Sequence, residues 1–173
     1  PTSKSRAAKQ CCDPFAELVR VDARGIALPG DVSEVDLVTG TVRTVITVGR
    51  HPRGVAWDEK NARLYVANGN SDTVSVIDTR TQTRLRSIAI KPFKERRIGF
   101  APTDVEVSPD GTTLYVTLGG LNAVGVYALP AGQFRGLIPT GWYPSSIDVS
   151  ADGSTLAVGA LFGVGSGEGR VSG

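Results

Sequence analysis

The chain has 173 residues and a formal net charge of +2, with 19 Lys and Arg against 17 Asp and Glu. This length allows one domain of ordinary size, and the nearly balanced charge gives no case for nucleic-acid binding. The sequence has no apolar run long enough to cross a bilayer, and its polar start shows no signal peptide.

The first 17 residues are polar and without periodicity, so we expect residues 1–17 to form an N-terminal arm. Cys11 and Cys12 are the only cysteines, and a disulfide between neighbours would be strained. We interpret them as two thiols, or as partners of cysteines outside this chain. Because the sequence has one histidine, a zinc site of Cys₄ or Cys₂His₂ type is excluded, and we predict no metal site and no cofactor.

A strand–turn–strand pattern occurs three times, starting at residues 51, 101 and 143. In the middle copy Val105 and Val107 alternate with Glu106, which places both valines on one face of a strand. The turn SPDG follows, and the run 112–118, rich in β-branched and aromatic residues, predicts the returning strand. Gly111 and Gly153 should have positive φ in these turns, and Asn61 holds the matching position in the first copy.

Two further strands are predicted beside each hairpin, the third at 31–36, 73–78 and 123–128, and the fourth at 42–48, 85–90 and 134–138. The copies lie 50 and then 42 residues apart, and a period of about 40–45 residues with strand-rich units is typical of propeller blades. We therefore predict an all-β fold: a partial β-propeller of four-stranded antiparallel blades over residues 18–173, about three to four blades, whose ring this chain alone does not close. The blades are expected at about 18–48, 52–90, 102–138 and 144–173.

The longer first interval places a basic insertion at 91–98, KPFKERRI. Its Lys91, Lys94, Arg96 and Arg97 could bind an anionic partner, but the interpretation we favour is a solvated loop between blades. The Gly-rich tail 162–173 contains neither a dinucleotide fingerprint nor a P-loop, and we interpret it as a loop.

The hairpin repeats resemble the YVTN family of β-propeller proteins. Tyr115, Val116 and Thr117 spell the first three letters of that name, while Asn68 supplies the fourth letter in the first copy. The run 137–167 is also similar to bacterial proteins in which such a propeller is joined to an alkaline-phosphatase-like phosphoesterase domain. The resemblance implies a periplasmic or secreted protein. None of the metal-binding or nucleophile motifs of that enzyme is present in the sequence.

No catalytic residue is predicted. His51 is the only histidine, and Ala101 and Tyr143 hold its place in the other copies, so the repeat does not require an imidazole there. Neither a nucleophile elbow nor an H-E-x-x-H motif occurs. We interpret His51 as an ordinary exposed or half-packed side chain.

The loops that lead into the hairpins share the form G-x-x-P. Repeat-equivalent positions lie around one axis at the same end of a propeller, so these loops should surround a common mouth. The ligand- or partner-binding residues predicted there are Arg50, His51, Phe100, Trp142 and Tyr143. Aromatic rings beside an arginine suit a binding site, but the rings could equally pack between adjacent blades.

The function predicted from the sequence is a non-catalytic binding or scaffold module that presents its inter-blade loops to an unidentified protein or small-molecule ligand. The alternatives are an accessory propeller of a phosphoesterase, or part of a propeller enzyme similar to lactonases or amine dehydrogenases. The remaining blades would come from a longer chain, another copy or another subunit. No nucleic acid and no membrane span are expected.

Overall fold

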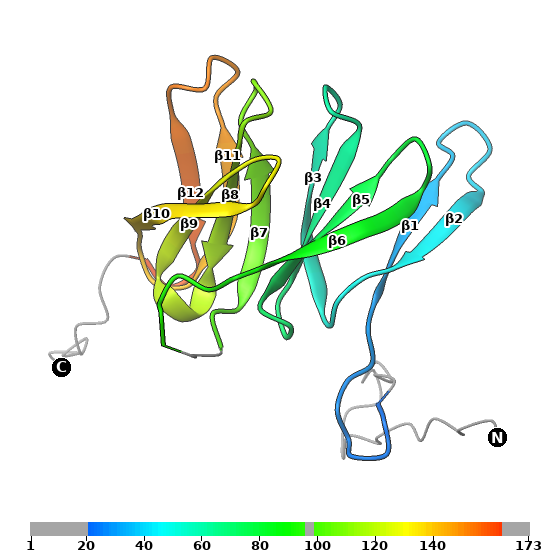
Figure 1. The fold of residues 1–173 in the computed structure, drawn as a ribbon, viewed down its shortest axis with the longest axis horizontal. Helices are drawn as coiled ribbons and strands as arrows, with labels where there is room; N and C mark the ends of the chain where they lie inside the picture. Colours follow the sequence, from blue (N-terminus) through cyan, green and yellow to red (C-terminus); the bar gives the residue numbers. More distant parts are fainter. Residues whose placement is uncertain (1–20, 96–98, 164–173) are drawn as a thin grey trace, which may run out of the picture.

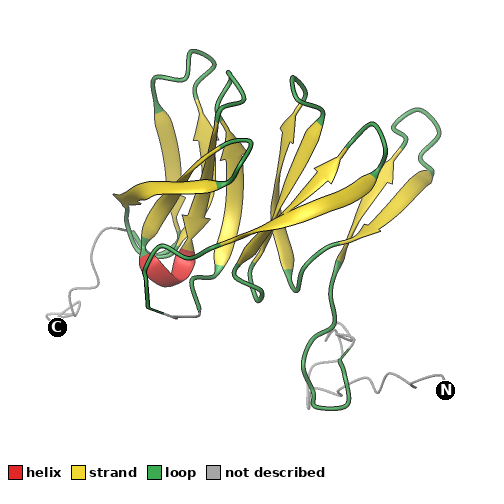
Figure 2. Ribbon diagram, in the orientation of Figure 1, coloured by secondary structure: helices red, strands yellow, loops and turns green. Residues whose placement is uncertain are grey.

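The structure is a computed structural model that describes residues 21–95 and 99–163. The arm predicted at 1–17, Cys11 and Cys12, Arg96 and Arg97, and residues 164–173 of the tail lie outside the described residues. Within the described part, antiparallel strands dominate, with one short 3₁₀ turn, η1 (Gly119–Leu121). Figure 2 shows this predominance of strands. No helix among the described residues is long and apolar enough to cross a membrane.

The strands form four separate antiparallel sheets (Figure 1). Two sheets have four strands each, in the sequential order β3-β4-β5-β6 and β7-β8-β9-β10, and two sheets have two strands, β1-β2 and β11-β12. The strands are β1 (Asp31–Val35), β2 (Val42–Thr47), β3 (Pro52–Asp58), β4 (Arg63–Asn68), β5 (Thr73–Asp78), β6 (Thr83–Ala89), β7 (Pro102–Val107), β8 (Thr113–Leu118), β9 (Ala123–Ala128), β10 (Gln133–Pro139), β11 (Pro144–Val149) and β12 (Leu156–Ala160). This arrangement confirms the predicted fold class, a partial propeller of four-stranded blades.

The first strands of the second, third and fourth sheets lie next to one another. β7 contacts β3 on one side and β11 on the other, so these three strands form the inner side of the array. The described residues before β1 add no strand to the first sheet. Val21 pairs with Ala27 in an isolated bridge. The first sheet therefore contains only the third and fourth strands of a blade, and the last contains only the first and second.

Hydrophobic side chains pack between neighbouring sheets. The larger cluster joins the two four-stranded sheets, with Val74, Val76 and Tyr65 on one side and Leu114 and Tyr127 on the other. A smaller cluster of Val48, Leu64, Val66 and Ile77 faces the first half-sheet. The sheet β3–β6 thus buries apolar side chains on both faces, as a blade between two neighbours requires.

The hairpin turns confirm part of the expected turn chemistry. Gly111 and Gly153 have positive φ, +74° and +72°. In the first copy the positive φ falls on Ala62, at +52°, and not on Asn61 as the alignment suggests. The reason is that the first turn is closed one residue later: Ala62 N–H donates to the Glu59 carbonyl at 3.2 Å, whereas Gly111 N–H donates to the Ser108 carbonyl at 2.8 Å. Asp58 accepts the Asn61 N–H at 3.0 Å and fixes this shifted turn.

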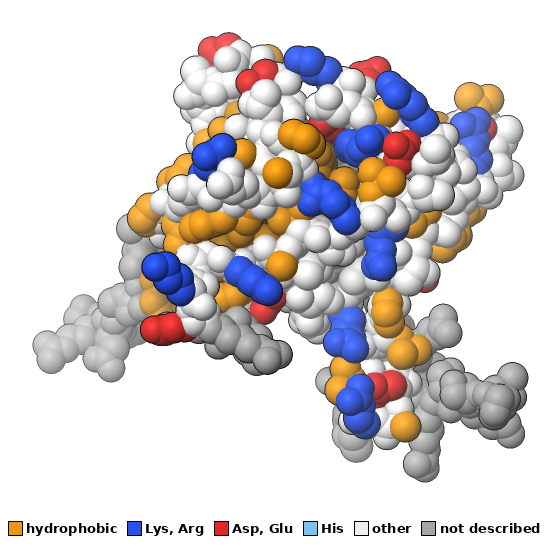
Figure 3. Space-filling view, in the orientation of Figure 1, with side chains coloured by type: hydrophobic (Ala, Val, Ile, Leu, Met, Phe, Trp, Pro, Cys, Tyr) orange, Lys and Arg blue, Asp and Glu red, His pale blue; other side chains and the backbone are white. Residues whose placement is uncertain are grey.

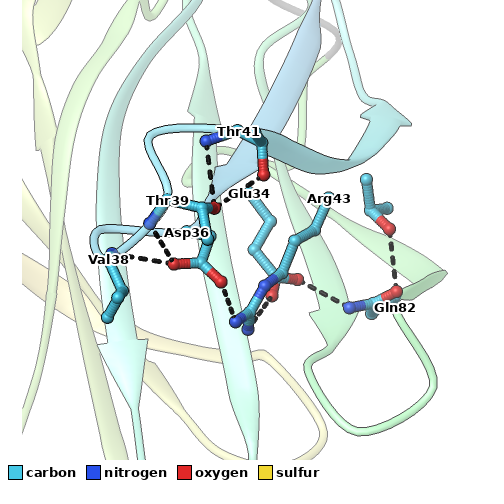
Figure 4. Close-up of polar contacts among 8 residues, drawn as sticks. Glu34, Asp36, Val38, Thr39, Thr41, Arg43 and Gln82 are labelled. Carbon is cyan, nitrogen blue, oxygen red and sulfur yellow. Dashed lines mark hydrogen bonds and ion pairs between the residues drawn. The ribbon is translucent and has the colours of Figure 1, made fainter.

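A polar cluster ties the first half-sheet to the second sheet (Figure 4). Asp36 accepts the N–H groups of Val38 and Thr39, at 2.7 and 3.0 Å, and pairs with Arg43. Hydrogen bonds from the Thr39 and Val38 N–H groups, followed by Arg43, lower the pKa of Asp36. Figure 4 shows Gln82, from the second sheet, reaching this cluster by donating to Glu34 at 2.7 Å. We assign the cluster a structural role, because most of its bonds stay within one turn.

Candidate functional site

The three G-x-x-P loops adopt the same backbone conformation. Their third residues, His51, Ala101 and Tyr143, all have positive φ, at 54°, 48° and 54°. The carbonyls of these residues accept the N–H groups of Gly69, Gly119 and Leu161 at 2.9, 3.0 and 3.0 Å. All three loops therefore lie at the same end of the sheets, where β3, β7 and β11 begin.

Side chains from the neighbouring turns fix two of these loops. The Asp72 carboxylate accepts the N–H of Gly99 at 2.7 Å and the N–H of Ala101 at 3.0 Å. At the next junction the equivalent residue, Asn122, accepts the N–H of Tyr143 at 3.0 Å. Each bond joins one sheet to the entry loop of the next, so the mouth has a defined backbone.

The structure gives the predicted site residues different surroundings. His51 is exposed, and Trp142 is 41% exposed. Phe100 is only 3% exposed, and its ring belongs to the larger core cluster. Arg50 is partly buried: its N–H donates to Ser71 Oγ at 2.8 Å, and its Nε is buried with no partner among the described residues. Phe100 thus packs between blades, while His51 and Trp142 remain accessible.

Tyr143 projects over the β8–β9 turn. A Cβ atom at Gly119 would lie 2.9 Å from Cζ of the Tyr143 ring, so the ring rests directly on this glycine. The Phe162 ring packs edge-on against the Tyr143 ring, with the two centroids 6.2 Å apart. The Tyr143 hydroxyl accepts a hydrogen bond from Arg53 Nη1 at 3.3 Å.

Arg53 is a mouth residue that the sequence analysis missed. It is the second residue of β3, while Tyr143 directly precedes β11, so their hydrogen bond passes over the intervening β7. Thr103 and Ser145 hold the equivalent places in the other two copies. Both side chains are short and uncharged, so the repeat pattern does not point to a charged residue at this position. The G-x-x-P motif ends one residue too early to include this position. A search for charged residues directly after the motif would have found it.

Acidic side chains lie further along the inner strands. The Asp104 carboxylate accepts the N–H of Ile147, on the neighbouring strand β11, at 3.1 Å. It also accepts the N–H of the next residue in the chain, Val105, at 3.0 Å. Burial raises the pKa of Asp104. Burial also raises the pKa of Glu106, with smaller contributions from the charges of Asp148 and Asp104. Among the described residues, no group of three or more His, Cys, Asp or Glu side chains is placed to hold a metal ion.

Comparisons with known proteins add support for the fold. No family model matches the chain, and no curated protein matches it. A solved structure of hydrazine synthase from Kuenenia stuttgartiensis is similar, with 30% sequence identity and a TM-score of 0.64 over 74% of this chain and 35% of that one. A functionally unknown protein from Desulfotomaculum acetoxidans DSM 771 is also similar, with 17% identity and a TM-score of 0.61 over 83% of this chain and 44% of that one.

The chain spans about a third of the length of the hydrazine synthase chain and under half of the second, at 35% and 44%. The likeness therefore concerns the fold, and a whole protein's activity does not follow from it. The four separate antiparallel sheets and these two similar structures together identify the described part of the chain as a partial β-propeller.

Proposed function

We propose that this chain is part of a non-catalytic, YVTN-like propeller that binds a ligand or partner at the mouth formed by its G-x-x-P loops. The observation that carries the proposal is the hydrogen bond between Arg53 and Tyr143, which joins the first and third inner strands at that mouth. The exposed His51 and the 41% exposed Trp142 lie in the same set of loops.

The chemistry of the mouth favours an acidic partner with apolar groups. Arg53 offers several N–H donors to a carboxylate, and the Trp142 indole supplies a large apolar surface with a single N–H donor. Tyr143 holds Arg53 through its hydroxyl, so the guanidinium is positioned before a partner arrives. An acidic peptide or a small aromatic acid has the matching groups.

The test is binding of acidic, neutral and basic peptides to the full-length protein, before and after substitution in the mouth. We expect Trp142→Ala and Arg53→Ala each to weaken binding of the acidic peptides by about tenfold. Lys60→Ala, at the opposite end of the same sheet, should leave that affinity unchanged. Equal binding of all three peptide classes, or equal loss in Lys60→Ala, would overturn the proposal.

A second candidate is an accessory propeller of a larger enzyme. It is supported by the 30% identity to a chain named hydrazine synthase and by the resemblance of residues 137–167 to propeller–phosphoesterase fusions. The full reading frame on both sides of this segment tests it, because a fused enzyme would show a catalytic domain there. A lactonase-like or amine-dehydrogenase-like site would need ligands or a cofactor partner from other blades.

We also propose that the protein acts outside the cytoplasm, as its resemblance to YVTN-family proteins implies. The supporting feature is the sequence similarity of the repeats around Tyr115–Thr117. Cell fractionation of the native protein tests this, and recovery in the cytoplasmic fraction alone would contradict it.

A further inference from the structure

A cavity of about 540 Å³ lies at the junction of the two four-stranded sheets, beside the G-x-x-P loop that contains Phe100. His51, Arg53, Trp142 and Tyr143 are not among the residues that line it. Its walls come from the β4–β5 turn, the end of β6 and the described start of the insertion. The lining residues that matter are Ser71, Thr73, Lys91, Phe93, Lys94 and Phe100. A volume of this size is within the range of about 300–1,000 Å³ that is usual for small-molecule sites.

The polar groups of the cavity are mostly hydrogen-bond donors. Ser71 Oγ accepts the N–H of Arg50 at 2.8 Å, and Thr73 Oγ1 accepts Nδ2 of Asn68 at 3.1 Å. Each hydroxyl therefore keeps its own hydrogen to donate to another group. A ligand in the cavity would meet two O–H donors that the protein itself does not use among the described residues.

Charged groups add to this donor character. Lys91 and Lys94 make no ion pair or hydrogen bond with another described residue. The Asp72 carboxylate, which also lines the cavity, is engaged with the N–H groups of Gly99 and Ala101. Glu95 brings one further carboxylate to the lining. Two ammonium groups and two hydroxyls thus belong to the lining, and the Asp72 carboxylate there is already bound by the backbone.

The remaining walls are apolar and aromatic. The rings of Phe93 and Phe100 lie with their centroids 6.2 Å apart and tilted by 54°. Phe100 and Ile90 are buried, while Phe93 is 41% exposed. Figure 3 shows basic side chains beside exposed hydrophobic atoms on this side of the molecule. A flat apolar group could pack on these rings while an attached anion reaches the donors.

These features do not recur at the next junction. There, Leu121 replaces Ser71 and Ala123 replaces Thr73, and Thr140 is followed directly by Gly141 with no insertion. A requirement of sheet-to-sheet packing would apply at both junctions. The two lysines and the Phe93 ring therefore have no counterpart there, whereas the Ser71 and Thr73 hydroxyls also hold Arg50 and Asn68 in place.

We propose that this cavity is a binding site for a small anion, a carboxylate or a phosphate, carried on a flat apolar body such as an aromatic ring. Lys91 and Lys94 bind the anionic group, the Ser71 and Thr73 hydroxyls donate to its oxygens, and Phe93 packs against the ring. From the sequence alone we interpret this segment as a solvated loop. The cavity that its residues line supports a role in ligand binding instead. The site borders the loop of Phe100, and His51, Arg53, Trp142 and Tyr143 do not line it.

The experiment is a calorimetric titration of the full-length protein with phenyl phosphate, benzoate, inorganic phosphate and phenol. We expect phenyl phosphate or benzoate to bind about tenfold more tightly than either inorganic phosphate or phenol, because only they engage both the donors and the rings. Whichever of the two binds more tightly identifies the anionic group. Absence of binding by both aromatic anions, or equal binding of phenyl phosphate and inorganic phosphate, would overturn the proposal.

Two matched double variants test the position of the site. Lys91→Ala with Lys94→Ala should weaken binding of the aromatic anion by about tenfold, since charge-assisted hydrogen bonds are lost. Arg80→Ala with Arg135→Ala removes the same charge from exposed positions elsewhere and should leave the affinity unchanged. Equal loss in both pairs would mean that only net charge attracts the anion. Unchanged melting temperatures would show that all variants are folded, and Trp142→Ala should not affect this binding.

Discussion

The Asn68 side chain accepts the N–H of Gly49 at 2.9 Å and so holds the loop that enters β3 against the end of β4. Its Nδ2 donates to Thr73 Oγ1 at 3.1 Å and to Ser75 Oγ at 3.0 Å, and the residue is fully buried. In the next sheet the matching residues are Leu118, Ala123 and Gly125, so the polar set is replaced as a whole. Asn68 therefore has a structural role. Its two hydroxyl partners are present in the copy that has the asparagine and absent in the copy that lacks it.

Asn68→Leu, which introduces the residue of the next repeat, should destabilise the protein by about 1–3 kcal/mol. The part-buried Gly49 N–H would be left without its acceptor, and the two hydroxyls would lose a donor. Urea denaturation measures the effect, and Asn70→Leu, at an exposed position two residues on, is the control. If both variants lose equally little stability, the Asn68 side chain does not hold the loop that enters β3 against the end of β4.

Gly111→Val should destabilise by more than about 1 kcal/mol, because a β-branched residue is strained at the φ of +74° found there. A Cβ at this position would also lie 2.5 Å from Asn61 Nδ2. Gly136→Ala is the matched control, since nothing lies within 4 Å of its Cβ position. Thermal unfolding compares the two, and an unchanged midpoint for Gly111→Val would contradict the turn assignment.

Stability should fall as the pH is lowered from about 4 toward 2. The Ser108 hydroxyl, followed by the Thr112 N–H, lowers the pKa of Asp110 to about 2, and Ser150 with Ser154 does the same for Asp152. A carboxyl whose pKa is lower in the folded state than the usual value near 3.9 stabilises that state above pH 4 and loses this contribution on protonation.

The double variant Asp110→Asn with Asp152→Asn should show a flatter dependence of unfolding free energy on pH in this window. Asp104 acts in the opposite direction, because burial raises its pKa and its contribution is lost as the pH rises through that value. Urea denaturation at a series of pH values separates the two effects. A double variant with an unchanged acid slope would contradict the assignment to Asp110 and Asp152.

Phe100 and Trp142 occupy the same repeat position, but their substitution by alanine should change the stability of the protein by different amounts. Phe100→Ala should cost about 3–5 kcal/mol, since its ring is 3% exposed and belongs to the core. Trp142→Ala should cost less than about 1 kcal/mol, because its side chain is 41% exposed. Denaturation curves of the two variants decide this, and a large loss for Trp142→Ala would assign it to packing.

The isolated 173-residue polypeptide should not be a stable monomer. Trp57 is 62% exposed on the face toward the first half-sheet, whereas its equivalent Val107 is 7% exposed between complete sheets. β1 and β12 each pair on one side only, and such edges invite further pairing. Sedimentation of the polypeptide alone should show association, and a monodisperse monomer with cooperative unfolding would contradict this expectation.

The strands were predictable because their signals are local. Alternating residues such as Val105 and Val107, and glycine at Gly111 and Gly153, specify strand and turn within a few residues of each other. The repeat then extends each assignment to the next copy. Asn61 shows the limit of that step, because Asp58 shifts the turn by one residue and moves the positive φ to Ala62.

The surroundings of the loop residues could not be predicted in the same way. The G-x-x-P spacing places Phe100 and Trp142 at equivalent points of the backbone, but it says nothing about what packs against each ring. Phe100 is buried next to Phe93, from the insertion that this junction alone contains among the three copies. Arg53 acquires its place through Tyr143, 90 residues away in the sequence.

Asp72 holds both ends of the insertion at 91–98. Its main-chain carbonyl accepts the N–H of Ile90 at 2.9 Å, just before the insertion, and its carboxylate accepts the N–H groups of Gly99 and Ala101 just after it. The length of the inserted segment is therefore independent of the distance between the sheets, and longer loops add little closure entropy. In evolutionary terms this junction is a site where the chain can gain or exchange residues, and with them new specificity, while the neighbouring blades keep their places.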